Sequence, residues 1–210
     1  MSSVARSKLP ISTIQLIRKA VLLVVVIGGL FVVTYGQSGW ADGSLMHEGI
    51  ELAGFFLIAV CIVGRTWCAF YIGGLKNRNL IDAGPYSITR NPLYVFSVIG
   101  AAGVGAQLGS LTIAIAAGVV TWAVFYVLIF SEERHLLNQF GAEYRGYVAR
   151  VPRFLPNFSL WRDMESLTIR PGIVRSTFVD ACLFLLSIPI AESFDYMHEL
   201  GWVPVLFKLP

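Results

Sequence analysis

Two polar stretches of the chain carry the residue types that bind small charged ligands. The first covers residues 84–94, and the second covers residues 131–156, directly after an apolar run that ends at Phe130. A guanidinium group holds a carboxylate or phosphate through two hydrogen bonds, while carboxylates and aromatic faces suit a cation. Together the stretches predict a pocket for a zwitterion. Its candidate residues are Tyr86, Arg90, Asn91, Tyr94, Glu132, Glu133, His135, Tyr144, Tyr147, Arg150 and Arg153.

The adjacent carboxylates Glu132 and Glu133 are the strongest single sign of a site. Carboxylates at the end of a membrane-length segment are costly unless they are paired or hydrated, so they mark function more often than a lipid-facing surface. The alternative is a solvated helix end. His135, beside them, is expected at the surface rather than in catalysis.

Composition indicates the element type that must position these residues. The 210-residue chain is 56% hydrophobic and only 14% charged, with a mean hydropathy of +0.69. Ordinary soluble domains carry about 25% charged residues. The net charge of +3 is spread along the chain, which argues against nucleic acid. Three cysteines lie in apolar segments without metal-ligand spacing, so no metal is predicted.

The apolar segments predict about five transmembrane helices in an all-α membrane protein. The first is expected to be a retained span, and Arg65, inside the second, either snorkels to the interface or turns inward to a polar site. The third and fourth form a hairpin, and the tail from Trp202 to Leu209 is expected at the interface. The predicted spans are residues 20–35, 49–72, 92–104, 108–130 and 177–191.

Charge placement predicts the topology. With these crossings, every Lys and Arg except Lys208 falls on one face of the membrane, so the N-terminus is expected in the cytoplasm. A two-helix hairpin returns the chain to the side from which it started. Residues 84–91 and 132–156 are therefore expected to be neighbours on the cytoplasmic face, although Arg90, Lys76 and Arg78 also fit simple topology determinants.

Two ordered motifs resemble a known enzyme family. One is Gly84-Pro85-Tyr86 followed by Arg90-Asn91-Pro92-Leu93-Tyr94. After a hairpin come Glu132-Glu133, Phe140-Gly141 and the run from Val151 to Pro156. This order is similar to the isoprenylcysteine carboxyl methyltransferases, integral membrane enzymes related to the phospholipid methyltransferases. The resemblance covers roughly residues 65–156.

The resemblance implies a cofactor pocket for S-adenosylmethionine at the cytoplasmic end of the hairpin. Its cofactor-binding residues would be Tyr86, Asn91, Pro92, Tyr94, Glu133, Tyr144 and Tyr147, with Arg90, Glu132 and Glu133 as catalytic candidates. The acceptor would enter from the bilayer, and Arg90 is the best candidate to orient it. An acid acceptor needs no base, whereas an amine acceptor would use Glu132 or Glu133.

Two features depart from the family pattern. Asn91 stands where the family usually has histidine, which leaves only amide hydrogen bonding. The chain also continues past Pro156. We expect a single membrane domain over residues 1–210, with a methyltransferase core at 65–156. A linker, a further span and the interfacial tail occupy 157–210.

The sequence therefore predicts methyl transfer from S-adenosylmethionine to a lipophilic acceptor in the cytoplasmic membrane. Carboxyl methylation of an isoprenylcysteine-like acid is the nearest named activity. N-methylation of a phospholipid amine and a non-enzymatic membrane scaffold or binder are the alternatives. Residues 100–105 are glycine-rich but lack the strand context of a nucleotide-binding loop, so close helix packing is expected there.

Overall fold

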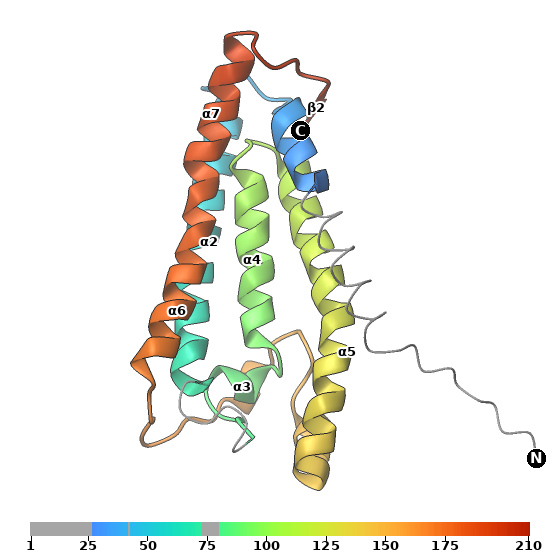
Figure 1. Cartoon of the computed structure of the whole chain (residues 1–210), viewed down its shortest axis with the longest axis vertical. Helices are drawn as coiled ribbons and strands as arrows, with labels where there is room; N and C mark the ends of the chain where they lie inside the picture. Colours follow the sequence, from blue (N-terminus) through green and yellow to red (C-terminus); the bar gives the residue numbers. More distant parts are fainter. Residues whose placement is uncertain (1–26, 42, 73–79) are drawn as a thin grey trace, which may run out of the picture.

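Helices make up most of the described part of the chain, as Figure 1 shows. The computed structural model describes residues 27–41, 43–72 and 80–210. Within them, the only strands are the short segments β1 (Gly36–Ser38) and β2 (Phe207–Leu209). Three helical stretches are long and apolar enough to cross a membrane: α2 (Leu45–Ile72), α5 (Leu111–Arg150) and the run Pro171–Glu199. The predicted all-α membrane fold is confirmed.

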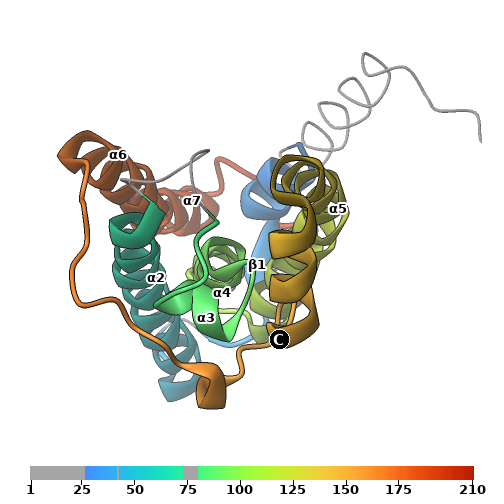
Figure 2. The same cartoon turned by 90° about the horizontal axis from the view of Figure 1, so that it is seen from below.

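The other predicted spans are shorter. Residues 27–35 are helical, and the rest of the first predicted span lies outside the described residues. The first hairpin arm is α4 (Pro92–Ala106), which has 15 residues. Figure 2 shows α4 near the middle of the bundle, between α2 and α5. The predicted topology determinants Lys76 and Arg78 also lie outside the described residues.

Glycines let α2 and α4 approach closely. A β carbon built on Gly54 would lie 2.8 Å from the carbonyl oxygen of Gly103, and one built on Gly103 would lie 2.8 Å from that of Gly54. One built on Gly100 would lie 2.5 Å from the sulfur of Cys61. Small residues at such crossings allow the backbone contacts that drive helix association in membranes. The packing function expected for residues 100–105 is confirmed.

The second hairpin arm, α5, is longer than the predicted arm. It continues past Phe130 through the polar stretch and ends at Arg150. Most of residues 132–139 are good helix formers, and the helix ends just before Pro152, which disfavours helical geometry in the residue that precedes it. One break occurs at Gly141, whose φ of 53° and ψ of −114° kink the helix. The kink sets the direction of residues 142–150.

Replacing Gly141 with alanine is expected to destabilise the protein by about 1–3 kcal/mol. No atom lies within 4 Å of a β carbon at this position, so the cost comes from the positive φ alone. The midpoint of thermal unfolding in detergent should fall by roughly 5 °C. Gly146→Ala is the matched control, because Gly146 has the same open surroundings in regular helix. Equal midpoints for the two variants would contradict this reading of the kink.

The last membrane-length stretch consists of α6 (Pro171–Cys182), a 3₁₀ turn at Leu183–Leu186 and α7 (Ser187–Glu199). Pro189 has no backbone N–H and its ring crowds the carbonyl of residue 185, which accounts for the 3₁₀ turn just before it. The N-terminal part, α6, packs against α2.

The C-terminal tail forms a strand at the end of the bundle opposite α3 (Pro85–Ile88) (Figure 1). There β2 pairs in parallel with β1, with Gly36 opposite Phe207 and Ser38 opposite Leu209. The tail was expected only to lie at the interface. Three-residue strands leave no periodic pattern in a sequence, so this pairing was not predicted.

Candidate active site

The loop before α4 and the segment after α5 are joined by hydrogen bonds. The amide of Arg90 donates to the carbonyl oxygen of Pro152 at 2.9 Å, and the amide of Asn157 donates to that of Ile88 at 2.9 Å. These contacts link residues more than 60 positions apart in the chain. The expectation that the two motifs are neighbours is confirmed.

Asn91 takes part in the same junction. Its side-chain amide donates to the carbonyl oxygen of Arg153 at 3.0 Å, and Pro92 follows it as the buried first residue of α4. Proline suits this position because its missing N–H has no partner in the first helical turn anyway. Asn91 therefore fixes the start of α4 relative to the segment after α5.

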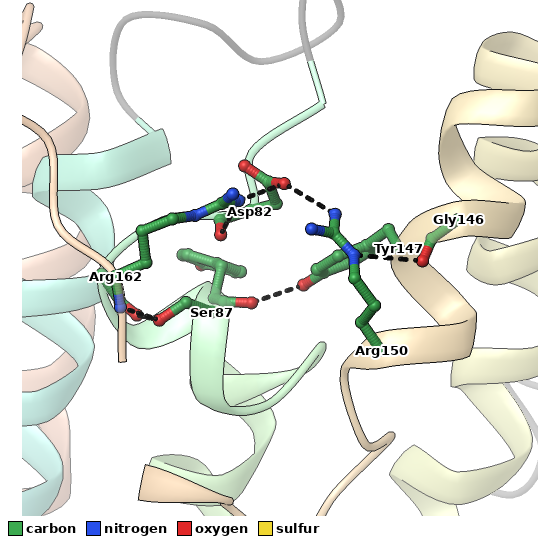
Figure 3. Close-up of polar contacts among 8 residues, drawn as sticks. Asp82, Ser87, Gly146, Tyr147, Arg150 and Arg162 are labelled. Atoms are coloured by element: carbon green, nitrogen blue, oxygen red, sulfur yellow. Dashed lines mark hydrogen bonds and ion pairs between the residues drawn. The ribbon is translucent and has the colours of Figure 1, made fainter. Parts of the chain in front are cut away.

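A second junction, drawn in Figure 3, joins residues 82–87 to α5 and to the segment that contains Arg162. The carboxylate of Asp82 pairs with Arg162 at 2.5 Å and with Arg150 at 3.3 Å. The Tyr147 hydroxyl donates to the carbonyl oxygen of Tyr86 at 2.8 Å. The exposed ion pairs contribute little by themselves, but the Tyr147 bond is buried and joins α5 to α3.

A cavity of about 610 Å³ lies at this end of the bundle. It falls within the roughly 300–1,000 Å³ typical of small-molecule sites. Nine residues were predicted to bind the cofactor or to act in catalysis. Six of them line this cavity, namely Tyr86, Arg90, Asn91, Tyr94, Glu132 and Tyr147. No lining residue comes from residues 157–210, all of which the structure describes.

The other three predicted residues lie outside this cavity. Pro92 is buried at the start of α4. Glu133 and Tyr144 line a second hollow of about 370 Å³. Glu133 accepts two hydrogen bonds from Arg153, at 3.1 and 2.8 Å, and lies 3.3 Å from Nη1 of Arg90. In this arrangement Glu133 holds the two arginines rather than facing the larger cavity.

Arg90 is buried but only partly satisfied. Its side chain is 8% exposed, and its contact with Glu133 is not aligned as a hydrogen bond. Within the described part of the chain, its Nε and Nη1 atoms have no hydrogen-bond partner. Buried N–H groups without partners carry a desolvation cost. They therefore favour an anion in the cavity that Arg90 lines.

Tyr86 adds another buried group without a partner. Tyr86 lines the cavity, and its buried hydroxyl forms no hydrogen bond to the described residues. Burial raises the pKa of Tyr86 well above its ordinary value. The phenol therefore stays protonated at neutral pH and can donate a hydrogen bond to a ligand.

Glu132 and Tyr94 form the acidic side of the cavity. The Tyr94 hydroxyl donates to Oε1 of Glu132 at 2.7 Å, and the Tyr94 ring packs against Phe125 with centroids 4.4 Å apart. A carboxylate beside aromatic rings suits a cationic group. The cavity thus offers both an anion side and a cation side, as the predicted zwitterion pocket requires.

The candidate residues from the sequence included neither Arg65 nor Ser97, which both line the cavity. Arg65 turns inward and donates from Nη1 to the hydroxyl of Ser97, so the snorkelling alternative is wrong. His135 is exposed, as predicted, but also lines the cavity. Ser97 follows Tyr94 by three residues, so both lie on one face of the helix. This spacing could have identified Ser97 as a site residue from the sequence.

Comparison with known proteins defines the class. The model of the phospholipid methyltransferase family matches residues 19–143. The chain therefore belongs to the phospholipid methyltransferase family, and the family and the fold together define an integral membrane methyltransferase. No solved structure matches the chain significantly.

Particular relatives extend the comparison. The cobalt-zinc-cadmium resistance protein CzcN of Cupriavidus metallidurans is 34% identical over 80% of this chain and 76% of its own length. The nickel-cobalt-cadmium resistance protein NccN of Alcaligenes xylosoxydans xylosoxydans is 32% identical over 83% of this chain and 81% of its own. The protein-S-isoprenylcysteine O-methyltransferase B of Arabidopsis thaliana is 36% identical over 47% of this chain and half of its own.

Proposed function

We propose that the chain transfers a methyl group from S-adenosylmethionine to a lipophilic acid at the large cavity. The observation that carries the proposal is the set of buried donors on Arg90 and Tyr86 that form no hydrogen bond to the described residues, in the cavity that the Glu132–Tyr94 pair also lines. The likeness to isoprenylcysteine O-methyltransferases supports an acid acceptor.

The residues of the cavity fit S-adenosylmethionine, which supplies a methyl group on a positively charged sulfur. Arg90 would hold a carboxylate, while Glu132 and the rings of Tyr94 and Phe125 would face the cationic groups. Tyr147 and Asn91 complete the wall through their junctions with α3 and the segment after α5. Holding both reactants in line, away from water, is the main task of such a site.

The charges of the lining residues favour an acid over an amine. Two guanidinium groups, on Arg65 and Arg90, line the cavity against one carboxylate, on Glu132. An acid acceptor is already ionised as a carboxylate at neutral pH and has no proton left to lose, so the cavity needs no base for it. N-methylation of a phospholipid amine remains the second candidate, because Glu132 lies in the cavity and could take the released proton.

We further propose that this end of the bundle faces the cytoplasm. The end of α2, α3 and the start of α4 lie together here with the end of α5 (Figure 1). Exposed arginines cluster in the same region, at Arg134, Arg145, Arg150 and Arg162. An excess of arginine and lysine is typical of cytoplasmic loops. The N-terminus would then also be cytoplasmic.

Transfer of labelled methyl groups tests the proposed function. Membranes with and without the protein are incubated with methyl-labelled S-adenosylmethionine and either farnesylcysteine or phosphatidylethanolamine. We expect protein-dependent label on farnesylcysteine that alkali releases as volatile methanol, since methyl esters hydrolyse in base. Alkali-stable label in the phospholipid head group would instead establish N-methylation. Absence of protein-dependent label on both would contradict the proposal.

A further inference from the structure

Arg65 lies inside α2, a helix that is long and apolar enough to cross a membrane. It precedes the end of α2 by seven residues, which is about 10 Å along a helix. Its hydrogen-bond acceptor, Ser97, lies five residues after the start of α4, or about 8 Å along that helix. Arg90, by contrast, belongs to the loop that precedes α4.

The charge of Arg65 has no carboxylate partner among the described residues. Nη1 donates to Ser97, whose own hydroxyl donates to the carbonyl of Leu93 at 2.7 Å, and Nε is buried without a hydrogen bond. A cation on a membrane-crossing helix is costly unless an anion or water compensates it. The cavity that Arg65 lines is the place from which such an anion can approach.

Tyr86 supplies a second donor to the cavity that Arg65 lines. Both residues keep a buried polar atom without a hydrogen-bond partner in the described chain. Burial raises the pKa of Tyr86, so its phenol keeps the proton that it would donate. An anion between them would accept hydrogen bonds from a guanidinium and a phenol.

We propose that Arg65 and Tyr86 bind the anionic head group of the acceptor at the membrane-embedded end of the cavity. Arg90, at the loop end, would then bind the carboxylate of the donor and not orient the acceptor, which was its role expected from the resemblance. The assignment rests on the proposed function and follows from depth: a lipophilic acid arrives through the bilayer, whereas a water-soluble donor arrives from the loop side. The ligands that this subsite would accept share an anionic carboxylate or phosphate attached to a lipid chain.

Direct binding without turnover tests the assignment. Purified protein in nanodiscs is titrated with N-acetyl farnesylcysteine, with its neutral carboxamide and, separately, with S-adenosylmethionine. We expect the acid to bind at least about 10-fold more tightly than the carboxamide, as hydrogen bonds to charged groups predict. Arg65→Gln should remove this preference, because it should lower the affinity for the acid and leave the affinity for the carboxamide unchanged. The same variant should leave the affinity for S-adenosylmethionine within about 2-fold.

Three further variants complete the design. Tyr86→Phe should lower the affinity for the acid by about 3- to 10-fold and leave the affinity for the carboxamide unchanged. It keeps the assignment testable where Arg65→Gln does not fold. Arg65→Lys keeps the charge and should recover part of the preference. Arg175→Gln, an exposed arginine on α6, is the matched control and should bind all three ligands normally.

The outcomes separate this inference from the proposed function. Phosphatidic acid can be tested as a competitor of N-acetyl farnesylcysteine. Competition that is present in the wild type and lost in Arg65→Gln would support the subsite and identify a phosphate head group as a ligand. An unchanged preference in Arg65→Gln, or a loss of S-adenosylmethionine binding in that variant, would overturn the assignment. Failure of methyl transfer to either acceptor would contradict the proposed function, while the binding preference and its loss in Arg65→Gln would stand.

Discussion

Glu133→Ala is expected to lower methyl transfer by at least about 100-fold, because one carboxylate holds two arginines of the site. Glu133 accepts both hydrogen bonds of Arg153 and pairs with Arg90 at 3.3 Å. Its side chain is only 14% exposed. Removing one partner of a buried ion pair typically costs about 3–5 kcal/mol, since the remaining charge is left uncompensated. The junction between α5 and the segment after it should loosen, and Arg90 should lose its fixed position.

The measurement is the initial rate of transfer together with the affinity for S-adenosylmethionine. Membrane insertion and helix content should remain normal, because no backbone hydrogen bond involves the Glu133 side chain. Glu143→Ala is the matched control, as Glu143 is an exposed glutamate on the same helix. A rate for Glu133→Ala that equals the rate of the control would remove Glu133 from the site.

Arg90→Lys is expected to lower kcat/KM by about 100-fold although the charge is kept. Lysine replaces a planar group that has several fixed donors with a single point charge. The Nε and Nη1 atoms of Arg90, which form no hydrogen bond to the described residues, depend on that planar geometry. The backbone bond from Arg90 to Pro152 does not involve the side chain, so the loop should keep its position.

Steady-state kinetics with each substrate varied in turn measure this effect. The KM for S-adenosylmethionine should rise more than the KM for the acceptor, since Arg90 is assigned to the donor. Arg175→Lys provides the control for a conservative change at an exposed arginine. Near-normal turnover in Arg90→Lys would mean that Arg90 only determines topology.

Long apolar segments and ordered motifs could be predicted from the sequence. The hairpin of α4 and α5 follows from two apolar runs, and it brings the two polar stretches together because a hairpin returns the chain to its starting side. The contact between Arg90 and Pro152 is the direct result. These features depend on hydrophobic length alone, which a single sequence contains.

The orientation of individual side chains could be predicted only in part. Glu132 and Glu133 are neighbours on a helix, so their side chains point about 100° apart. The sequence leaves both as candidates, and only the packing of α5 against α4 shows that Glu132 lines the large cavity. The inward turn of Arg65 likewise depends on Ser97, which belongs to another helix.

The kink at Gly141 and the pairing of β1 with β2 show a different limit. A glycine in a polar helix is compatible with regular or kinked backbone, and only its positive φ distinguishes the two. The strands join residues about 170 positions apart through backbone bonds, which leave no side-chain pattern. Neither feature has a pattern in the neighbouring sequence that would predict it.

Photocrosslinking of labelled S-adenosylmethionine to the purified protein tests the central claim most directly. We predict saturable labelling, competed by unlabelled S-adenosylmethionine, with the label confined to peptides that contain residues 83–94 or 131–147. Glu133→Ala should lose the label, and Glu143→Ala should keep it. Labelling that does not saturate, or that maps to residues 171–210, would contradict the proposal that this cavity holds the methyl donor.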